Sequence, residues 1–160
     1  MHKAKRVLVP VLAAAVWLAA LLVELGNAQA LDQVLYVAPG GNCGGAAPCY
    51  ATIQAAIDQS AAGDEIRVAT GAYSGVNTQG GLSQVAYLTK SISLRGGFTT
   101  ADWNTPNPTA NPTTLDANNR GRAIAIIGPA DVTLEGLTLT NGNAAGLRGD
   151  PNNPTSANTG

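Results

Sequence analysis

The sequence predicts an all-β solenoid, a stack of short strands that begins with a single capping helix. From residue 64 onward, short runs rich in Val, Ile, Leu and Thr end at Gly, Asn or Asp, which is typical of strands separated by turns. Some of these runs repeat at a near-constant spacing, and one short amphipathic segment precedes them all. A single turn of strands cannot bury its apolar row alone, so such units fold by stacking.

Residues 1–30 have the three parts of a secretory signal peptide. A basic start, MHKAKR, precedes an uncharged apolar run at residues 7–23, and small residues follow at Ala28 and Ala30. We expect cleavage after Ala30 and a secreted or cell-surface protein. The alternative is an uncleaved membrane anchor, because the apolar run is close to the ~17 residues of the shortest membrane spans. This segment would be the only contact with a membrane.

Residues 31–63 are predicted to form an N-terminal cap. After a short strand and turn, VLYVAPGG, come Cys43 and Cys49, which we expect to form a disulfide because exported proteins meet oxidising conditions. Two thiols without further Cys or His cannot complete a tetrahedral zinc site.

A helix is predicted over residues 52–61. The Thr52 hydroxyl is suited to cap its first turn, and Gly63 would end it. One apolar stripe at helical spacing contains Ile53, Ala56, Ile57 and Ala61. Three turns are too few for a stable isolated helix, so we expect it to cover the open lower end of the stack.

Residues 64–142 are predicted to be the first rungs of the stack. At an offset of 40, Ile92 and Leu94 match Val132 and Leu134. A second match, at an offset of 39, joins Val85, Tyr87 and Leu88 to Ile124, Ile126 and Ile127. A loop rich in Pro, Asn and Thr, residues 98–113, is inserted between the copies, and the spacing of 26 from Ile66 to Ile92 indicates the length of a rung without it. Residues 143–160 are a Gly- and Asn-rich loop or disordered tail.

The segment CYATIQAAIDQSAAGDEIRVATGAYSG resembles the N-terminal cap of right-handed parallel β-helix proteins of the pectin-lyase-like type. Residues 53–57 match the helix core of that cap, Gly63-Asp64 the link to the first strand, and residues 71–73 its Gly-x-Tyr turn. SISLRGGF, TTLDANNRG and VTLEGLTLTNG are similar to its first rungs. The resemblance implies a right-handed parallel β-helix, apparently truncated. It does not specify chemistry, because the cap recurs in polysaccharide lyases, glycosidases, adhesins and surface proteins.

Composition excludes several kinds of chemistry. The single histidine, His2, lies in the predicted signal peptide, so the rest of the chain cannot build a Ser-His-Asp or Cys-His centre. Nine basic and ten acidic residues give a net charge of −1 without a basic cluster, which argues against a nucleic-acid partner. We predict no catalytic, cofactor-binding or metal-ligating residue and no cofactor.

Carboxylates offer only weak candidate sites. Asp64 and Glu65 are adjacent, but neighbouring residues of a strand point to opposite faces, so a turn residue and an exposed strand residue are the simpler interpretation. A weak cation or sugar site is conceivable on the later strands, where solvated positions are again the simpler interpretation. Its members would be Asp116, Asp131 and Glu135, with Arg95 or Arg122.

Three aromatic residues are candidates for stacking against a sugar ring: Trp103, Tyr73 and Tyr87. We select Trp103 and Tyr87 as possible ligand contacts; the alternative for Trp103 is to hold its loop against the strands. We therefore expect an exported, non-catalytic β-helix repeat protein that binds polysaccharide or another cell-surface ligand. The alternative is the N-terminal part of a polysaccharide lyase or glycoside hydrolase whose active site lies beyond residue 160.

Overall fold

The computed structural model describes residues 32–145. The predicted signal peptide and residues 146–160 of the predicted tail lie outside the described residues. The described part is rich in β-strands and contains a single α-helix, α2 (Ile53–Gln59), and a short 3₁₀ turn, η2 (Pro39–Gly41). It contains no helix with the length and apolar character that crossing a membrane requires.

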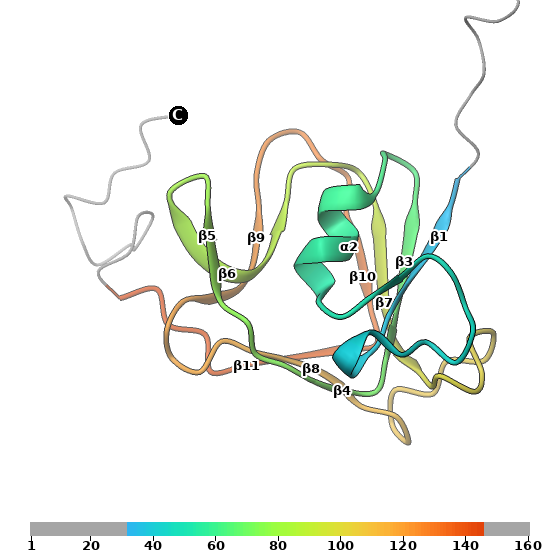
Figure 1. Cartoon of the computed structure of the whole chain (residues 1–160). Helices are drawn as coiled ribbons and strands as arrows, with labels where there is room; N and C mark the ends of the chain where they lie inside the picture. Colours follow the sequence, from blue (N-terminus) through green and yellow to red (C-terminus); the bar gives the residue numbers. More distant parts are fainter. Residues whose placement is uncertain (1–31, 146–160) are drawn as a thin grey trace, which may run out of the picture. The chain divides into compact units, whose positions relative to one another are not determined.

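The strands form three sheets, here called A, B and C (Figure 1). Sheet A has the order β10 (Thr133–Glu135), β7 (Ser93–Phe98), β3 (Glu65–Ala69), β1 (Val34–Val37) and β2 (Cys49–Tyr50). Sheet B has the order β11 (Leu137–Thr140), β8 (Thr113–Asp116) and β4 (Gly71–Tyr73). Sheet C has the order β5 (Asn77–Gln79), β6 (Leu82–Leu88) and β9 (Arg122–Ile126).

Every strand pair is parallel except β5–β6, which is an antiparallel hairpin. From β3 onward the chain enters sheets A, B and C in turn and then repeats this order. From β7 onward, each strand therefore pairs with a strand from the previous visit to the same sheet. The predicted β-rich chain with one helix is confirmed in this form, with parallel sheets.

The inner side of sheet A carries one apolar row. Its members pair in register along the sheet and are Leu35, Ile66, Leu94 and Leu134. The repeat of Leu94 and Leu134 at an offset of 40 is confirmed by this pairing. The spacing from Ile66 to Ile92 does not give the register, because Ile66 pairs with Leu94 and Ile92 is buried in the turn before β7.

The predicted offset of 39 in the second repeat is wrong. Strands β6 and β9 pair at an offset of 38, with the inner pairs Ala86–Ile124 and Leu88–Ile126. The turn between β9 and β10, residues 127–132, is two residues longer than the turn between β6 and β7, residues 89–92. The two extra residues of the β9–β10 turn explain why the offset rises from 38 in sheet C to 40 between β7 and β10 in sheet A.

Helix α2 is shorter than predicted. Thr52 caps it as expected, because its hydroxyl accepts a hydrogen bond from the Ala55 N–H (3.2 Å). The helix ends at Gln59 with Ser60 as C-cap, and Gly63 instead forms the turn before β3 with a φ of +97°. The predicted apolar stripe is buried except for Ala61, which is exposed.

Lys90 explains why the helix ends at this point. Lys90 follows β6 in the sequence. Its ammonium group donates hydrogen bonds to the carbonyl oxygens of Ile57 (2.7 Å), Asp58 (3.4 Å) and Ser60 (2.5 Å). Carbonyl oxygens of a last helical turn lack partners within the helix, so a cation there supplies both donors and a favourable charge.

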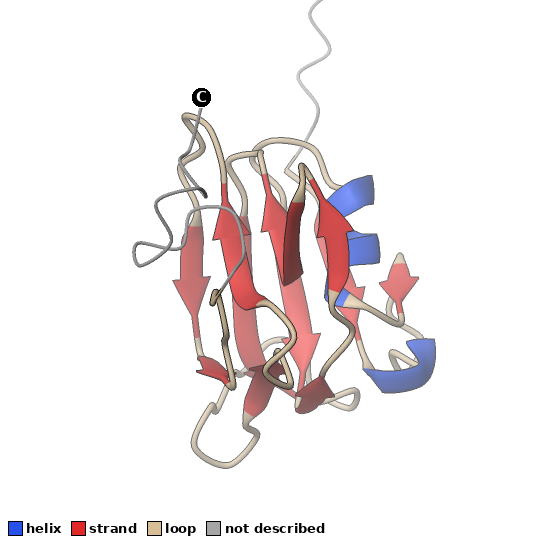
Figure 2. Ribbon diagram, turned by 90° about the vertical axis from the view of Figure 1, so that its left-hand side faces the viewer, coloured by secondary structure: helices blue, strands red, loops and turns tan. Residues whose placement is uncertain are grey.

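The lower end of the core is closed by two structures rather than by the helix alone. Strands β1 and β2 extend sheet A beyond β3, while α2 packs beside β6 and buries Ile53 and Ile57. Figure 2 shows the strands standing side by side, with the helical segments at one end of the row. The helix therefore covers an end of the core, as predicted, but shares this role with two strands.

Candidate ligand-binding site

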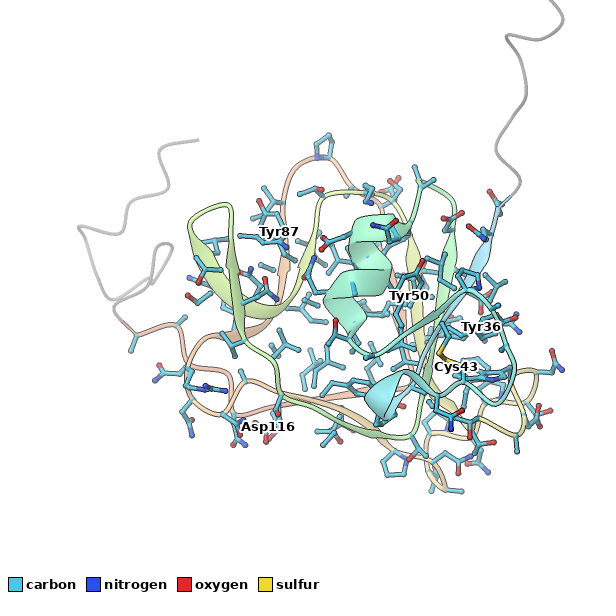
Figure 3. All side chains as sticks on the ribbon, viewed as in Figure 1. Tyr36, Cys43, Tyr50, Tyr87 and Asp116 are labelled. Atoms are coloured by element: carbon cyan, nitrogen blue, oxygen red, sulfur yellow. A yellow bond between two sulfur atoms is a disulfide. The ribbon has the colours of Figure 1, made fainter. Side chains whose placement is uncertain are left out.

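The two cysteines form the predicted disulfide, Cys43–Cys49 (Figure 3). Trp103 lies against this loop: its indole N–H donates to the Cys43 carbonyl oxygen (3.1 Å), and its ring contacts Tyr36 and Phe98. Only 9% of Trp103 is exposed. These contacts hold the inserted loop, residues 99–112 in the structure, against the strands. They fit the structural interpretation of Trp103, while its contact with a ligand stays a prediction.

Tyr87 is half-buried on β6 beside the capping helix (Figure 3). Its backbone N–H donates to Gln54 Oε1 (2.8 Å), and Gln54 Nε2 lies 3.3 Å from the Tyr87 carbonyl oxygen. The Gln54 amide thus pairs with β6 on the side where α2 lies, in the way that a neighbouring strand would. The helix is thereby bonded to the sheet as well as packed against it.

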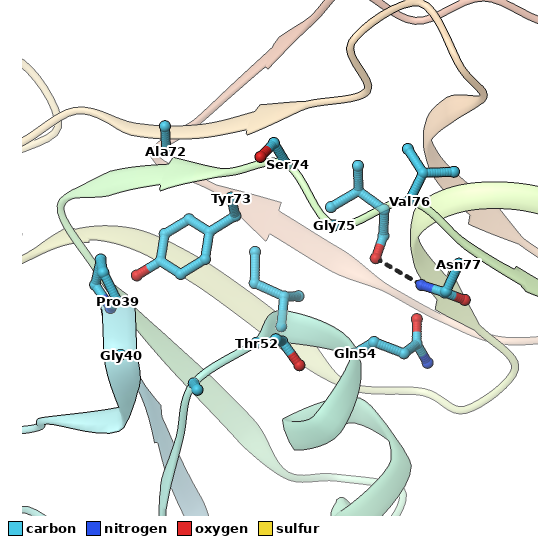
Figure 4. A pocket seen from close by; sticks show the side chains of 13 residues that line it. Pro39, Gly40, Thr52, Gln54, Ala72, Tyr73, Ser74, Gly75, Val76 and Asn77 are labelled. Atoms are coloured by element: carbon cyan, nitrogen blue, oxygen red, sulfur yellow. Dashed lines mark hydrogen bonds between the residues drawn. The ribbon is translucent and has the colours of Figure 1, made fainter.

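A pocket of about 460 Å³ opens beside this helix (Figure 4). It lies between η2, the start of α2, and the segment that runs from β4 to β5. Its lining consists of Pro39, Gly40, Ala51, Thr52, Ile53, Gln54, Ala72, Tyr73, Ser74, Gly75, Val76, Asn77 and Val85. None of these residues is charged, which distinguishes the pocket from sites for ionic ligands.

Tyr73 supplies the aromatic surface of the pocket. Its hydroxyl lies 3.0 Å from the Ala69 carbonyl oxygen and 3.4 Å from that of Val37, so it is committed to the backbone of sheet A. Burial raises the pKa of the Tyr73 hydroxyl above its usual value of 10. The side chain is therefore neutral near pH 7, and its ring offers an apolar surface beside Pro39 (Figure 4).

Amide and hydroxyl groups line the other side of the pocket. Asn77 is fixed, because its Nδ2 donates to the Val85 carbonyl oxygen (3.2 Å) and its Oδ1 accepts from Gln84 (3.5 Å). Thr52 Oγ1 accepts the N–H of the capped helix, which leaves its own O–H able to donate to a ligand. The Ser74 hydroxyl is exposed at the edge.

The carboxylates considered in the sequence do not converge. Asp64 is buried and accepts from the N–H groups of Gln33 (2.8 Å) and Ala61 (2.7 Å), whereas Glu65 points outward to arginines. Asp116 accepts from Asn118 and Asn141 in a turn, whereas Glu135 pairs with Arg95, which also contacts Glu65. Residues 32–145 contain no group of three acidic, Cys or His residues with the geometry to bind a metal ion.

The pocket joins segments that are distant in the sequence, which is why residue patterns did not identify it. Of the three aromatic candidates, the structure places only Tyr73 in its lining, and Tyr87 is linked to it through Gln54. Two signals in the sequence concern this region: the Gly71–Tyr73 turn, interpreted as part of the cap, and Tyr73 as a candidate for stacking against a sugar ring. Searches against protein-family models, curated proteins and solved structures found no match to this chain.

Proposed function

We propose that the chain is an exported, non-catalytic protein of the right-handed parallel β-helix type, secreted or held at the cell surface, which binds neutral carbohydrate. The repeated visits to sheets A, B and C in parallel register support the β-helix part of this proposal. The signal-peptide pattern and the Cys43–Cys49 disulfide support export.

The uncharged lining of the pocket supports the ligand class. A sugar ring has one apolar face and a rim of hydroxyl groups, and it fits an aromatic surface with a few fixed amide and hydroxyl groups. Tyr73 provides that surface, and Thr52, Ser74 and Asn77 provide the polar groups. Anionic sugars such as uronates would need a cation, and the pocket lining contains none.

The pocket can be blocked at Gly75 without damage to the fold. A Cβ atom added there meets nothing within 4 Å, and the residue does not have a positive φ. Gly75→Trp should therefore fill the pocket while leaving the melting temperature nearly unchanged. Ala62→Trp, at an exposed residue after α2 that does not line the pocket, is the matched control.

The test is isothermal titration of the full chain with neutral cello-, xylo- and manno-oligosaccharides, with an oligogalacturonide as the acidic counterpart. We expect one neutral series to bind, Gly75→Trp to weaken that binding about tenfold or more, and Ala62→Trp to leave it unchanged. No unsaturated product should appear by ultraviolet absorbance. Absence of neutral-sugar binding, or binding that ignores Gly75→Trp, would exclude the pocket as the site.

A further inference from the structure

The disulfide loop, residues 42–50, joins two walls of the pocket. Pro39 and Gly40 line the pocket before this loop, and Ala51 begins the wall that follows it. The two walls meet where the loop closes, since a Cβ atom on Gly41 would be only 3.5 Å from the Cβ of Ala51. The distance between the walls therefore depends on what holds the ends of the loop together.

The Cys43–Cys49 disulfide is the main restraint on this loop. Strand β2 has only two residues and, within residues 32–145, pairs with β1 alone. The segment between the cysteines, GGAAP, has small side chains that bury little apolar surface. A two-residue edge strand with so little packing is marginal without a covalent link. Cys49 Sγ also lies 3.2 Å from the Gly41 carbonyl oxygen, so the disulfide touches the residue where the two walls meet.

The disulfide loop also packs against the inserted loop, residues 99–112. The Trp103 indole N–H donates to the Cys43 carbonyl oxygen (3.1 Å), and a Cβ atom on Gly44 would clash with the Thr100 carbonyl oxygen. The two loops contribute to a second apolar cluster, distinct from the main core, which consists of Ala38, Cys43, Ala69, Phe98 and Trp103. A separate cluster under long loops can open as a unit while the main core stays folded.

We propose that the Cys43–Cys49 disulfide is a redox switch for the pocket. Reduction releases the disulfide loop from the inserted loop and from η2, while sheets A, B and C stay folded. The walls at Gly40 and Ala51 then separate, and the pocket loses affinity for its ligand. This control of ligand binding rests on the proposed function, whereas the release of the two loops does not.

The switching step is thiol–disulfide exchange with a dithiol. One thiolate of the dithiol attacks Cys49 Sγ, because Cys49 is half-buried whereas Cys43 is only 3% exposed. The bond between the two cysteines breaks, and Cys43 leaves as a thiolate and takes up a proton. The second thiol of the reagent then displaces Cys49 from the mixed disulfide. The dithiol is oxidised to a disulfide, and the two cysteines receive its electrons and protons.

The release of the loops is tested on the full chain with Trp17→Phe, which leaves Trp103 as its single tryptophan. Dithiothreitol should shift the Trp103 emission to longer wavelengths, because the ring leaves a buried site, and reoxidation should reverse the shift. Amide hydrogen exchange should become faster at Ala38, which bonds to β2, and stay unchanged at Ser93, which bonds to the segment before β3. Alkylation of the thiols confirms that both cysteines are reduced.

The effect on the pocket is tested by titration with the neutral oligosaccharides. The oxidised chain should bind about tenfold more tightly than the reduced chain, because the disulfide preorganises the two walls. The double variant Cys43→Ser, Cys49→Ser is the matched control. It should bind like the reduced chain, and dithiothreitol should change neither its emission nor its affinity.

Four results would overturn the switch. The first is a disulfide that dithiothreitol reduces only in denaturant, and the second is unchanged emission and Ala38 exchange after full reduction. The third is faster exchange at Ser93 as well, which would make the disulfide a staple for the whole fold. The fourth is equal affinity of the oxidised and reduced chains for the sugar. If the oxidised chain binds no neutral sugar, the proposed function fails, and emission and exchange still decide whether reduction releases the loops.

Discussion

Glu65 lies between two guanidinium groups on the outer face of sheet A. Its Oε1 atom is 2.9 Å from Arg67 Nε and 3.2 Å from Arg95 Nη1. Burial of the carboxyl favours its neutral form, but the hydrogen bonds and charges of Arg67 and Arg95 together outweigh this effect and lower the pKa below its usual value of 4.5. The ionised carboxylate therefore favours the folded state.

The sign of the pH dependence follows from that shift. The folded-state pKa of Glu65 is lower than the unfolded one, so its stabilisation is complete above about pH 4.5 and is lost as the pH falls through the folded pKa. Replacement of Glu65 by Gln should lower the free energy of unfolding more at about pH 7 than at about pH 3. Urea titrations at both pH values measure this. An equal effect at both would mean that packing, not charge, is lost.

The structural roles of some individual residues could be predicted from the sequence, and those of others could not. The cysteines and Thr52 could be assigned from sequence because a disulfide and a helix cap depend on neighbouring residues. The environment of Tyr73 could not, and that of Trp103 was one of two alternatives, because their burial results from segments far apart in the chain. Sequence reasoning placed Trp103 first among three aromatic residues, whereas only Tyr73 lines the pocket.

At the scale of elements, α2 is held by side chains that replace backbone partners. Gln54 is 9% exposed and bonds to both the N–H and the carbonyl oxygen of Tyr87, with Asp58 accepting from its amide at 2.8 Å. An apolar side chain of the same size would keep the packing but leave the strand groups of Tyr87 without partners. Leaving such a buried group unsatisfied costs about 1–3 kcal/mol.

Gln54→Leu should therefore lower the free energy of unfolding by about 1–3 kcal/mol and raise the hydrogen exchange rate of the Tyr87 amide. Gln59→Leu is the matched control, because Gln59 is exposed at the end of the same helix. Thermal melts and amide exchange measure the two effects. If both variants melt like the wild type, the bond between α2 and β6 contributes nothing to stability.

Element types were easier to predict than their lengths. Apolar runs ending at Gly or Asn indicated β3, β7, β9, β10 and β11, and among these β3 and β7 begin with alternating buried residues. The β5–β6 hairpin was not expected, because β5 is short and polar and forms only by pairing with β6. The end of α2 was misplaced because Lys90, about 30 residues away, supplies its C-terminal partners.

At the scale of the molecule, the spacing between successive strands leaves no room at Gly96. A Cβ atom there would lie 2.5 Å from the Gly136 carbonyl oxygen and 2.8 Å from the Cβ of Thr113. Gly96 does not have a positive φ, so its requirement is steric and comes from the neighbouring strands of sheets A and B. The register between the strands therefore requires glycine at position 96, and the local sequence does not explain this requirement.

Gly96→Ala should lower the free energy of unfolding by about 1–3 kcal/mol, because the backbone of Gly136 and the side chains of Thr113 and Leu137 would have to move. Gly75→Ala is the matched control: it also lacks a positive φ but faces open space, so it should be neutral or slightly stabilising. Chemical denaturation measures both. Similar stability for the two variants would mean that the strands near Gly96 separate easily.

The contacts of Lys90 also give the molecule an internal chemical reporter. No other lysine follows residue 30, and the amine of this one is occupied by three carbonyl oxygens of the last turn of α2. We expect these hydrogen bonds to slow acylation of that nitrogen for as long as the turn stays in place. The rate of modification at this position would therefore count how often the lower end of the core opens in a population of folded molecules.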